Sequence, residues 1–158
     1  MKKSELKRIS VLGLSPKFDL LQTLAGQLTR SFPQSWFDKA NNYYKGIQYL
    51  TSYTYDSIIL DVNIFEGYEL MVRALDRNVP LLVLVDSDRP PTAIERLIAL
   101  KARAVIQKNK IYQIDVAAII EKVVCPGNLI NGGTIREVIR DCFLCFKIFS
   151  RMEDKKEA

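Results

Sequence analysis

The chain has 158 residues, the length of one ordinary domain, and its 48% hydrophobic and 26% charged residues are normal for a globular protein. No apolar run approaches the ~20 residues of a membrane-spanning helix. The net charge of +5 is modest, and we expect no nucleic-acid partner. The chain has no histidine, which excludes Ser–His and Cys–His catalysis, and its three cysteines form no metal-ligand pattern. We therefore expect a cytoplasmic protein with no metal site, no disulfide framework and no membrane partner.

Short apolar segments alternate with amphipathic segments along most of the chain. In chain order, the predicted elements are a strand at 8–13, a helix at 18–28, a strand at 36–40, a helix at 43–53, a strand at 57–62, a helix at 68–77, a strand at 81–86, a helix at 92–100, a strand at 103–107 and a helix at 111–124. The strand at 57–62 is apolar on both faces, which is typical of a central parallel strand.

The alternation of strands and helices predicts the fold class. Parallel strands joined by right-handed helical crossovers form a sheet that is covered on both faces. We therefore expect an α/β, flavodoxin-like, doubly wound sheet of five parallel strands in the order 2-1-3-4-5, followed by a C-terminal helix. In such folds the functional crevice lies at the carboxyl ends of the strands, where Asp61, Asp86 and Lys108 are expected.

The end of the chain departs from this pattern. We expect one domain over 8–124, a linker over 125–133, where glycine and proline gather, and an amphipathic helix over 134–153. The apolar residues of this helix follow a heptad repeat: Ile135, Val138, Cys142, Cys145, Phe149 and Met152. The repeat predicts a homodimer through this helix, with packing against its own domain as the alternative.

Four segments together resemble the response-regulator receiver domain family, the CheY-like domains. They are Asp56–Asp61, Gly67–Leu70, Pro80–Val85 and Lys101–Lys108, and the resemblance covers about residues 8–124. It implies a signalling module of a bacterial two-component or phosphorelay system and not an enzyme. It also implies Asp61 as the phosphoacceptor and Lys108 as a residue that contacts the phosphoryl group.

The sequence departs from the family at the residues that support phosphorylation. Gly13 and Leu14 match the two acids that hold Mg²⁺ in the family, and Val85 matches a Thr or Ser. Asn109 stands where the family usually has a proline, and the loop over 62–66 is short. Since Mg²⁺ needs hard oxygen ligands, these changes predict weak metal binding and a loss of metal-assisted phosphoryl transfer.

We therefore interpret the chain as a receiver-like module that needs no cofactor and acts by contact with a protein partner. In this interpretation Asp61 forms an ion pair with Lys108, because an unpaired buried carboxylate is costly. A second hypothesis keeps Asp61 as a phosphoacceptor, with Mg²⁺ in a rearranged site completed by Glu66, Asp86 or Ser87. A third is a nucleotide or flavin binder on the same fold.

Overall fold

The computed structural model describes residues 8–86 and 102–124. The elements are β1 (Ser10–Leu14), α1 (Phe18–Ser31), β2 (Trp36–Ala40), α2 (Tyr43–Ser52), β3 (Ser57–Asp61), α3 (Gly67–Asp76), β4 (Leu81–Val85), β5 (Ala104–Gln107), the 3₁₀ turn η1 (Lys108–Lys110) and α5 (Val116–Val124). The predicted helix at 92–100, the linker at 125–133 and the helix at 134–153 lie outside the described residues.

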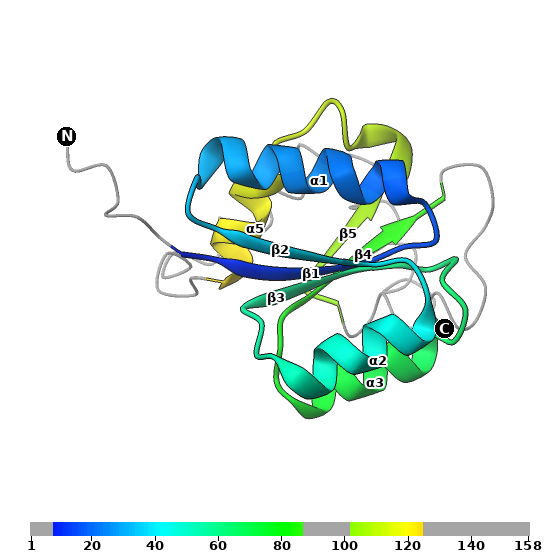
Figure 1. Ribbon diagram of the computed structural model, residues 1–158. Coiled ribbons are helices and arrows are strands. Elements are labelled where there is room, and N and C mark those ends of the chain that lie inside the picture. The colour runs from blue at the N-terminus through cyan, green and yellow to red at the C-terminus, as the bar shows by residue number, and fades with distance from the viewer. Residues whose placement is uncertain (1–7, 87–101, 125–158) are drawn as a thin grey trace, which may run out of the picture.

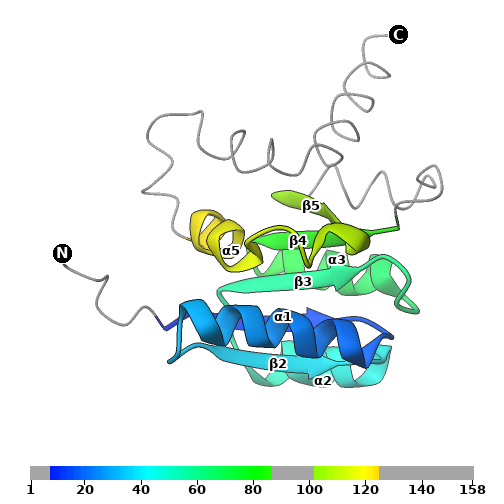
Figure 2. The ribbon, with the colours of Figure 1, turned by 90° about the horizontal axis from the view of Figure 1, so that it is seen from above.

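The strands form one sheet in the order β2-β1-β3-β4-β5, and each neighbouring pair is parallel. Figure 1 shows α1 and α5 on one face of this sheet and α2 and α3 on the other, while Figure 2 shows the strands one after another across it. This arrangement confirms the predicted fold class and strand order. None of the helices in the described part has the length and apolar character that a membrane crossing requires.

The central strands are fully buried because both faces of the sheet are covered. Every residue of β3 and β4 is buried, whereas β2, at the edge of the sheet, buries only Ala40. The burial of apolar surface drives the formation of such a layer at about 25 cal/mol per Å². The polar residue that the central strands bury at their carboxyl end, Asp61, therefore requires a specific set of partners.

The register of the strands decides which residues face which helical layer. A Cβ atom at Gly13 would lie 2.9 Å from Leu21 of α1, so this position faces α1. The next residue, Leu14, lies against Gly46 of α2, on the opposite face. Because side chains alternate along a strand, Ser15 is again on the α1 side of the sheet.

The sequence analysis placed the start of the last helix at residue 111, but α5 begins at Val116. The segment before it is held by a contact with α1: the Gln27 side-chain amide donates to the Ile111 carbonyl at 2.8 Å and accepts from the Val116 N–H at 3.2 Å. The Asp115 carboxylate then accepts from the Ala118 N–H at 3.1 Å and caps the helix. These contacts stop the helix from extending toward its predicted start.

A buried tyrosine gives the first testable prediction, which concerns pH. The Tyr55 hydroxyl donates to Asp38 at 2.5 Å, and burial, with the hydrogen bond to this carboxylate, raises the pKa of Tyr55. The stabilisation is present below the ordinary tyrosine pKa of about 10 and is lost as the pH rises above it, because the unfolded chain ionises first. Replacing Tyr55 by phenylalanine should lower the free energy of unfolding by about 1–2 kcal/mol at neutral pH.

The measurement is urea unfolding of the wild type and Tyr55→Phe at neutral pH and above pH 10. The loss of stability above pH 10 should be smaller in Tyr55→Phe than in the wild type. Tyr53→Phe is the matched control, because Tyr53 is 58% exposed and its loss should change neither quantity appreciably. An unchanged pH dependence in Tyr55→Phe would contradict this role of the buried hydroxyl.

Candidate functional site

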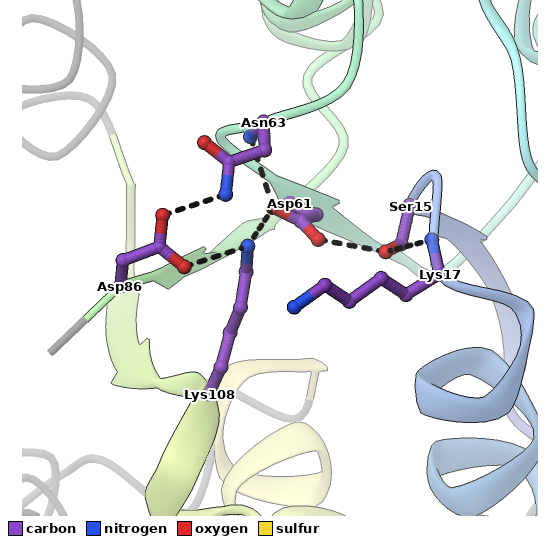
Figure 3. Close-up of polar contacts among 6 residues, drawn as sticks. All are labelled: Ser15, Lys17, Asp61, Asn63, Asp86 and Lys108. Atoms are coloured by element: carbon purple, nitrogen blue, oxygen red, sulfur yellow. Dashed lines mark hydrogen bonds and ion pairs between the residues drawn. The ribbon is translucent and has the colours of Figure 1, made fainter.

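The candidate site lies at the carboxyl edge of the sheet and is built around Asp61. Asp61 is the last residue of β3 and is fully buried, with 0% exposure. Its Oδ2 accepts a hydrogen bond from the Ser15 hydroxyl at 2.7 Å, and its Oδ1 accepts one from the Asn63 N–H at 2.9 Å. Both oxygens of this carboxylate are therefore engaged by donors of the neighbouring loops (Figure 3).

Lys108 joins Asp61 to a second carboxylate. Its Nζ lies 2.5 Å from Asp61 Oδ1 and 3.1 Å from Asp86 Oδ1, so the expected ion pair between Lys108 and Asp61 is present. The Lys108 ammonium is therefore shared between two carboxylates. The Asn63 side-chain amide donates to Asp86 Oδ2 at 2.6 Å, which closes a ring of four residues.

The ring explains how a carboxylate can be fully buried here. An ionised group that leaves water loses several kcal/mol of solvation, and only a close counter-charge with further hydrogen bonds can offset that loss. Lys108 supplies the charge, while Ser15 and Asn63 supply the hydrogen bonds. The Lys108 side chain is itself only 10% exposed, so water screens this ion pair weakly.

Ser15 was missed by the sequence analysis, although the topology brings it to the site. Leu14 of β1 pairs with Leu60 of β3, so the residue that follows Leu14 arrives beside Asp61. Ser15 is held there because its N–H donates to the Ala40 carbonyl and its hydroxyl accepts from the Lys17 N–H, each at 3.1 Å. The sequence analysis ended the first strand at residue 13, whereas β1 ends at Leu14. With the correct end, Ser15 would have been expected beside Asp61.

Gly13 and Leu14, the positions matched to metal-binding acids, present no group to Asp61. A Cβ atom at Gly13 would lie 2.6 Å from Phe37 Cζ and 2.9 Å from Leu21 Cδ2, and Leu14 points to the opposite face of the sheet. The space beside Gly13 is thus filled by apolar side chains. The polar neighbour that β1 provides to the carboxylate comes from Ser15 instead.

The other candidate residues have different fates. Asp86 is brought into the site beside Lys108, as described above. Glu66 lies outside it: it is exposed, has a left-handed φ of 59° before α3, and makes no contact with Asp61 among the described residues. Ser87 lies outside the described residues. Val85 is buried at 5% exposure and carries no hydroxyl that could contact a phosphoryl group.

The residues of this edge do not fit the Mg²⁺ that the fold suggests. Among the described residues, no group of three acidic, cysteine or histidine side chains could hold a metal ion. The two carboxylates of this edge, Asp61 and Asp86, already contact the Lys108 ammonium. Mg²⁺ requires near-octahedral oxygen ligands and would meet a fixed positive charge at this place.

Figure 3 adds a second lysine to the edge. The Lys17 side chain extends from the β1–α1 loop in the direction of Lys108. Lys17 is exposed to solvent, whereas Asp61 is fully buried. Two lysines thus lie at this edge, Lys17 after β1 and Lys108 after β5.

The fold of the chain is that of solved receiver domains. The N-terminal domain of a response regulator/sensory box/GGDEF protein from Carboxydothermus hydrogenoformans matches with a TM-score of 0.59 and 16% identity, over 73% of this chain and 92% of that one. A Francisella response regulator receiver domain matches with a TM-score of 0.59 and 14% identity, over 74% and 97% of the two chains. The phosphorylated cyanobacterial phytochrome response regulator RcpA matches with a TM-score of 0.61 and 16% identity, over 75% and 95%.

At these identities the likeness establishes a receiver fold and leaves the function to the site. No family model matches the chain, and no curated protein matches it at a significant level. Asp61, which the resemblance matches to the phosphoacceptor, lies at the carboxyl edge of the sheet with Lys108 beside it.

Proposed function

We propose that this chain is a receiver-like signalling module of a bacterial two-component or phosphorelay system that acts through contact with a protein partner. In this proposal it is not an enzyme, and Mg²⁺-dependent phosphorylation of Asp61 is slight or absent. The observation that carries the proposal is the enclosure of Asp61: it is fully buried, and both of its oxygens already accept contacts.

Phosphoryl transfer places demands that this site does not meet. An attacking carboxylate oxygen must approach phosphorus in line, and the charge on the equatorial oxygens must be neutralised. A bound phosphoryl group adds about two negative charges. One Lys108 ammonium already serves two carboxylates, and the other lysine drawn at this edge, Lys17, is exposed to solvent, so the added charge would be only partly neutralised.

The partner is expected to be a protein of the same signalling pathway, and no cofactor is part of the proposal. The homodimer through residues 134–153 remains a prediction, because these residues lie outside the described part of the chain. The phosphoacceptor hypothesis would need a rearrangement that frees Asp61 from Ser15 and Lys108. It is the outcome that the following experiment detects.

The test is intact-mass spectrometry of the chain after incubation with acetyl phosphate, with and without Mg²⁺. We expect no phosphoryl adduct on the wild type under conditions that label an active receiver domain to completion. Asp61→Asn is the matched variant, and it should likewise show no phosphoryl adduct. A quantitative, Mg²⁺-dependent adduct that disappears in Asp61→Asn would overturn the proposal.

A further inference from the structure

A pocket lies at the amino edge of the sheet, at the opposite end of the strands from Asp61. Its volume is about 380 Å³, within the range of pockets that take small molecules. The residues that line it lie at or just before the starts of β1, β2 and β3: Arg8, Ile9, Ser10, Gln34, Trp36 and Asp56. We propose that this pocket binds a small zwitterion with an apolar group, the chemistry of an α-amino acid with an apolar side chain.

The backbone around the pocket is held by contacts between neighbouring strands. The Trp36 N–H donates to the Ile9 carbonyl at 2.9 Å, and the Asp56 N–H donates to the Ser10 carbonyl at 2.8 Å. These contacts fix the starts of β2 and β3 on either side of β1. Because the pocket is already formed, a ligand would lose little free energy to ordering of the backbone.

Asp56 offers an oriented carboxylate oxygen to a ligand. Its Oδ2 accepts from the Ser10 N–H at 2.8 Å and from the Ser10 hydroxyl at 3.1 Å. Its Oδ1 accepts no hydrogen bond and forms no ion pair within the described part of the chain. Since the Ser10 contacts fix the direction of this carboxylate, Oδ1 is placed to accept from a ligand ammonium.

Arg8 supplies the opposite charge at the same pocket. Its Nε lies 3.5 Å from Gln34 Oε1, a long contact, and its terminal nitrogens have no partner among residues 8–86 and 102–124. Arg8 and Asp56 form no ion pair with each other, although both line the pocket. A cation and an anion that share a pocket without neutralising each other suit a ligand that carries both charges.

Trp36 provides the apolar wall. It is the first residue of the edge strand β2, and its side chain is 66% exposed. Covering part of an indole with an apolar group is favourable, and the aromatic face also attracts a cation. A simple amine would bind Asp56 but meet repulsion from Arg8, and a simple carboxylate would meet the reverse. A zwitterion with an apolar side chain satisfies all three groups.

The test uses the fluorescence of Trp36, which is the chain's only tryptophan. L-leucine, L-methionine and L-phenylalanine are titrated into the full-length protein. At least one should give a saturable change with half-saturation at roughly millimolar concentration or below. The amine and the acid that keep its side chain, for leucine 3-methylbutylamine and 4-methylpentanoate, should bind at least about tenfold more weakly.

Two variants separate the charges of the pocket. Asp56→Asn keeps an oxygen that can accept from Ser10, and Arg8 is exposed, so both Asp56→Asn and Arg8→Gln should fold. Each should weaken amino-acid binding about fivefold, the effect of an exposed ion pair. Asp56→Asn should not weaken binding of the simple acid, nor Arg8→Gln that of the simple amine. Asp19→Asn is the matched control, because Asp19 lies in the first turn of α1 and not at the pocket.

Amide shifts in ¹H–¹⁵N NMR locate the ligand and should gather at residues 8–10, 34–36 and 56. The proposal fails if none of the three amino acids binds, if the amine or the acid binds as tightly, or if the shifts gather elsewhere. It also fails if both charge variants bind as the wild type does. If a variant does not fold, the ligand series on the wild type decides alone. Phosphorylation of Asp61, at the opposite edge, would contradict the proposed function without changing these readouts.

Discussion

Replacing Lys108 by methionine should lower the free energy of unfolding by about 3–5 kcal/mol, the cost of leaving a buried charge without its partner. Methionine keeps most of the apolar length of the lysine side chain, so the loss reports mainly on the charge. The fully buried Asp61 would face Asp86 with no ammonium between them. Urea unfolding followed by circular dichroism measures the difference.

Two further variants separate the ion pair from general damage. Lys110→Met, two residues away, should cost less than about 1 kcal/mol, because Lys110 belongs to no buried ion pair in the described residues. Adding Asp61→Asn to Lys108→Met should restore part of the lost stability, since it removes the unpaired charge. Equal losses in the Lys108 and Lys110 variants would show that the buried ion pair does not stabilise the fold.

Placing an acid at Gly13 should destabilise the fold by about 3 kcal/mol or more, because it combines overpacking with a buried unpaired charge. The new Cβ atom alone would lie 2.6 Å from Phe37 Cζ and 2.9 Å from Leu21 Cδ2. The carboxylate would then enter an apolar region. We therefore expect Gly13→Asp to weaken the protein strongly and not to create Mg²⁺ binding, as measured by urea unfolding and Mn²⁺ titration.

Alanine substitutions separate the two causes. Gly13→Ala tests packing alone and should cost about 1–3 kcal/mol. Gly26→Ala is the opposite control: Gly26 lies within α1, a new Cβ atom there would meet nothing within 4 Å, and the change should stabilise the helix by roughly 0.5–1 kcal/mol. A Gly13→Asp variant as stable as the wild type would mean that Phe37 and Leu21 yield easily.

The fold could be predicted from the sequence because its main signal is local. Five short apolar segments separated by amphipathic ones specify a covered parallel sheet, and the observed strand order is the predicted one. The start of α5 could not be predicted in the same way. Ile111 and Ile114 fit a helical pattern, but Gln27, which is 84 residues before Ile111 in the chain, binds the Ile111 carbonyl.

The charged residues of the site were predictable, and its neutral ones were not. Asp61, Asp86 and Lys108 are conspicuous because each charge directly follows an apolar strand. Ser15 and Asn63 lie in turns, where such residues are common for local reasons. Their contacts with the carboxylates depend on strand register and loop conformation, which a pattern of apolar residues determines only to within a residue or two.

The close packing at Gly13 also limits how this sequence can change by single substitutions. A single exchange of Gly13 for aspartate would place the new carboxylate against Phe37 and Leu21. A loss of about 3 kcal/mol in the free energy of unfolding is a large part of the stability of an ordinary domain. An acid at this position would therefore need compensating changes in α1 and β2. The apolar neighbours of Gly13 therefore act as a barrier to an acidic residue at this position.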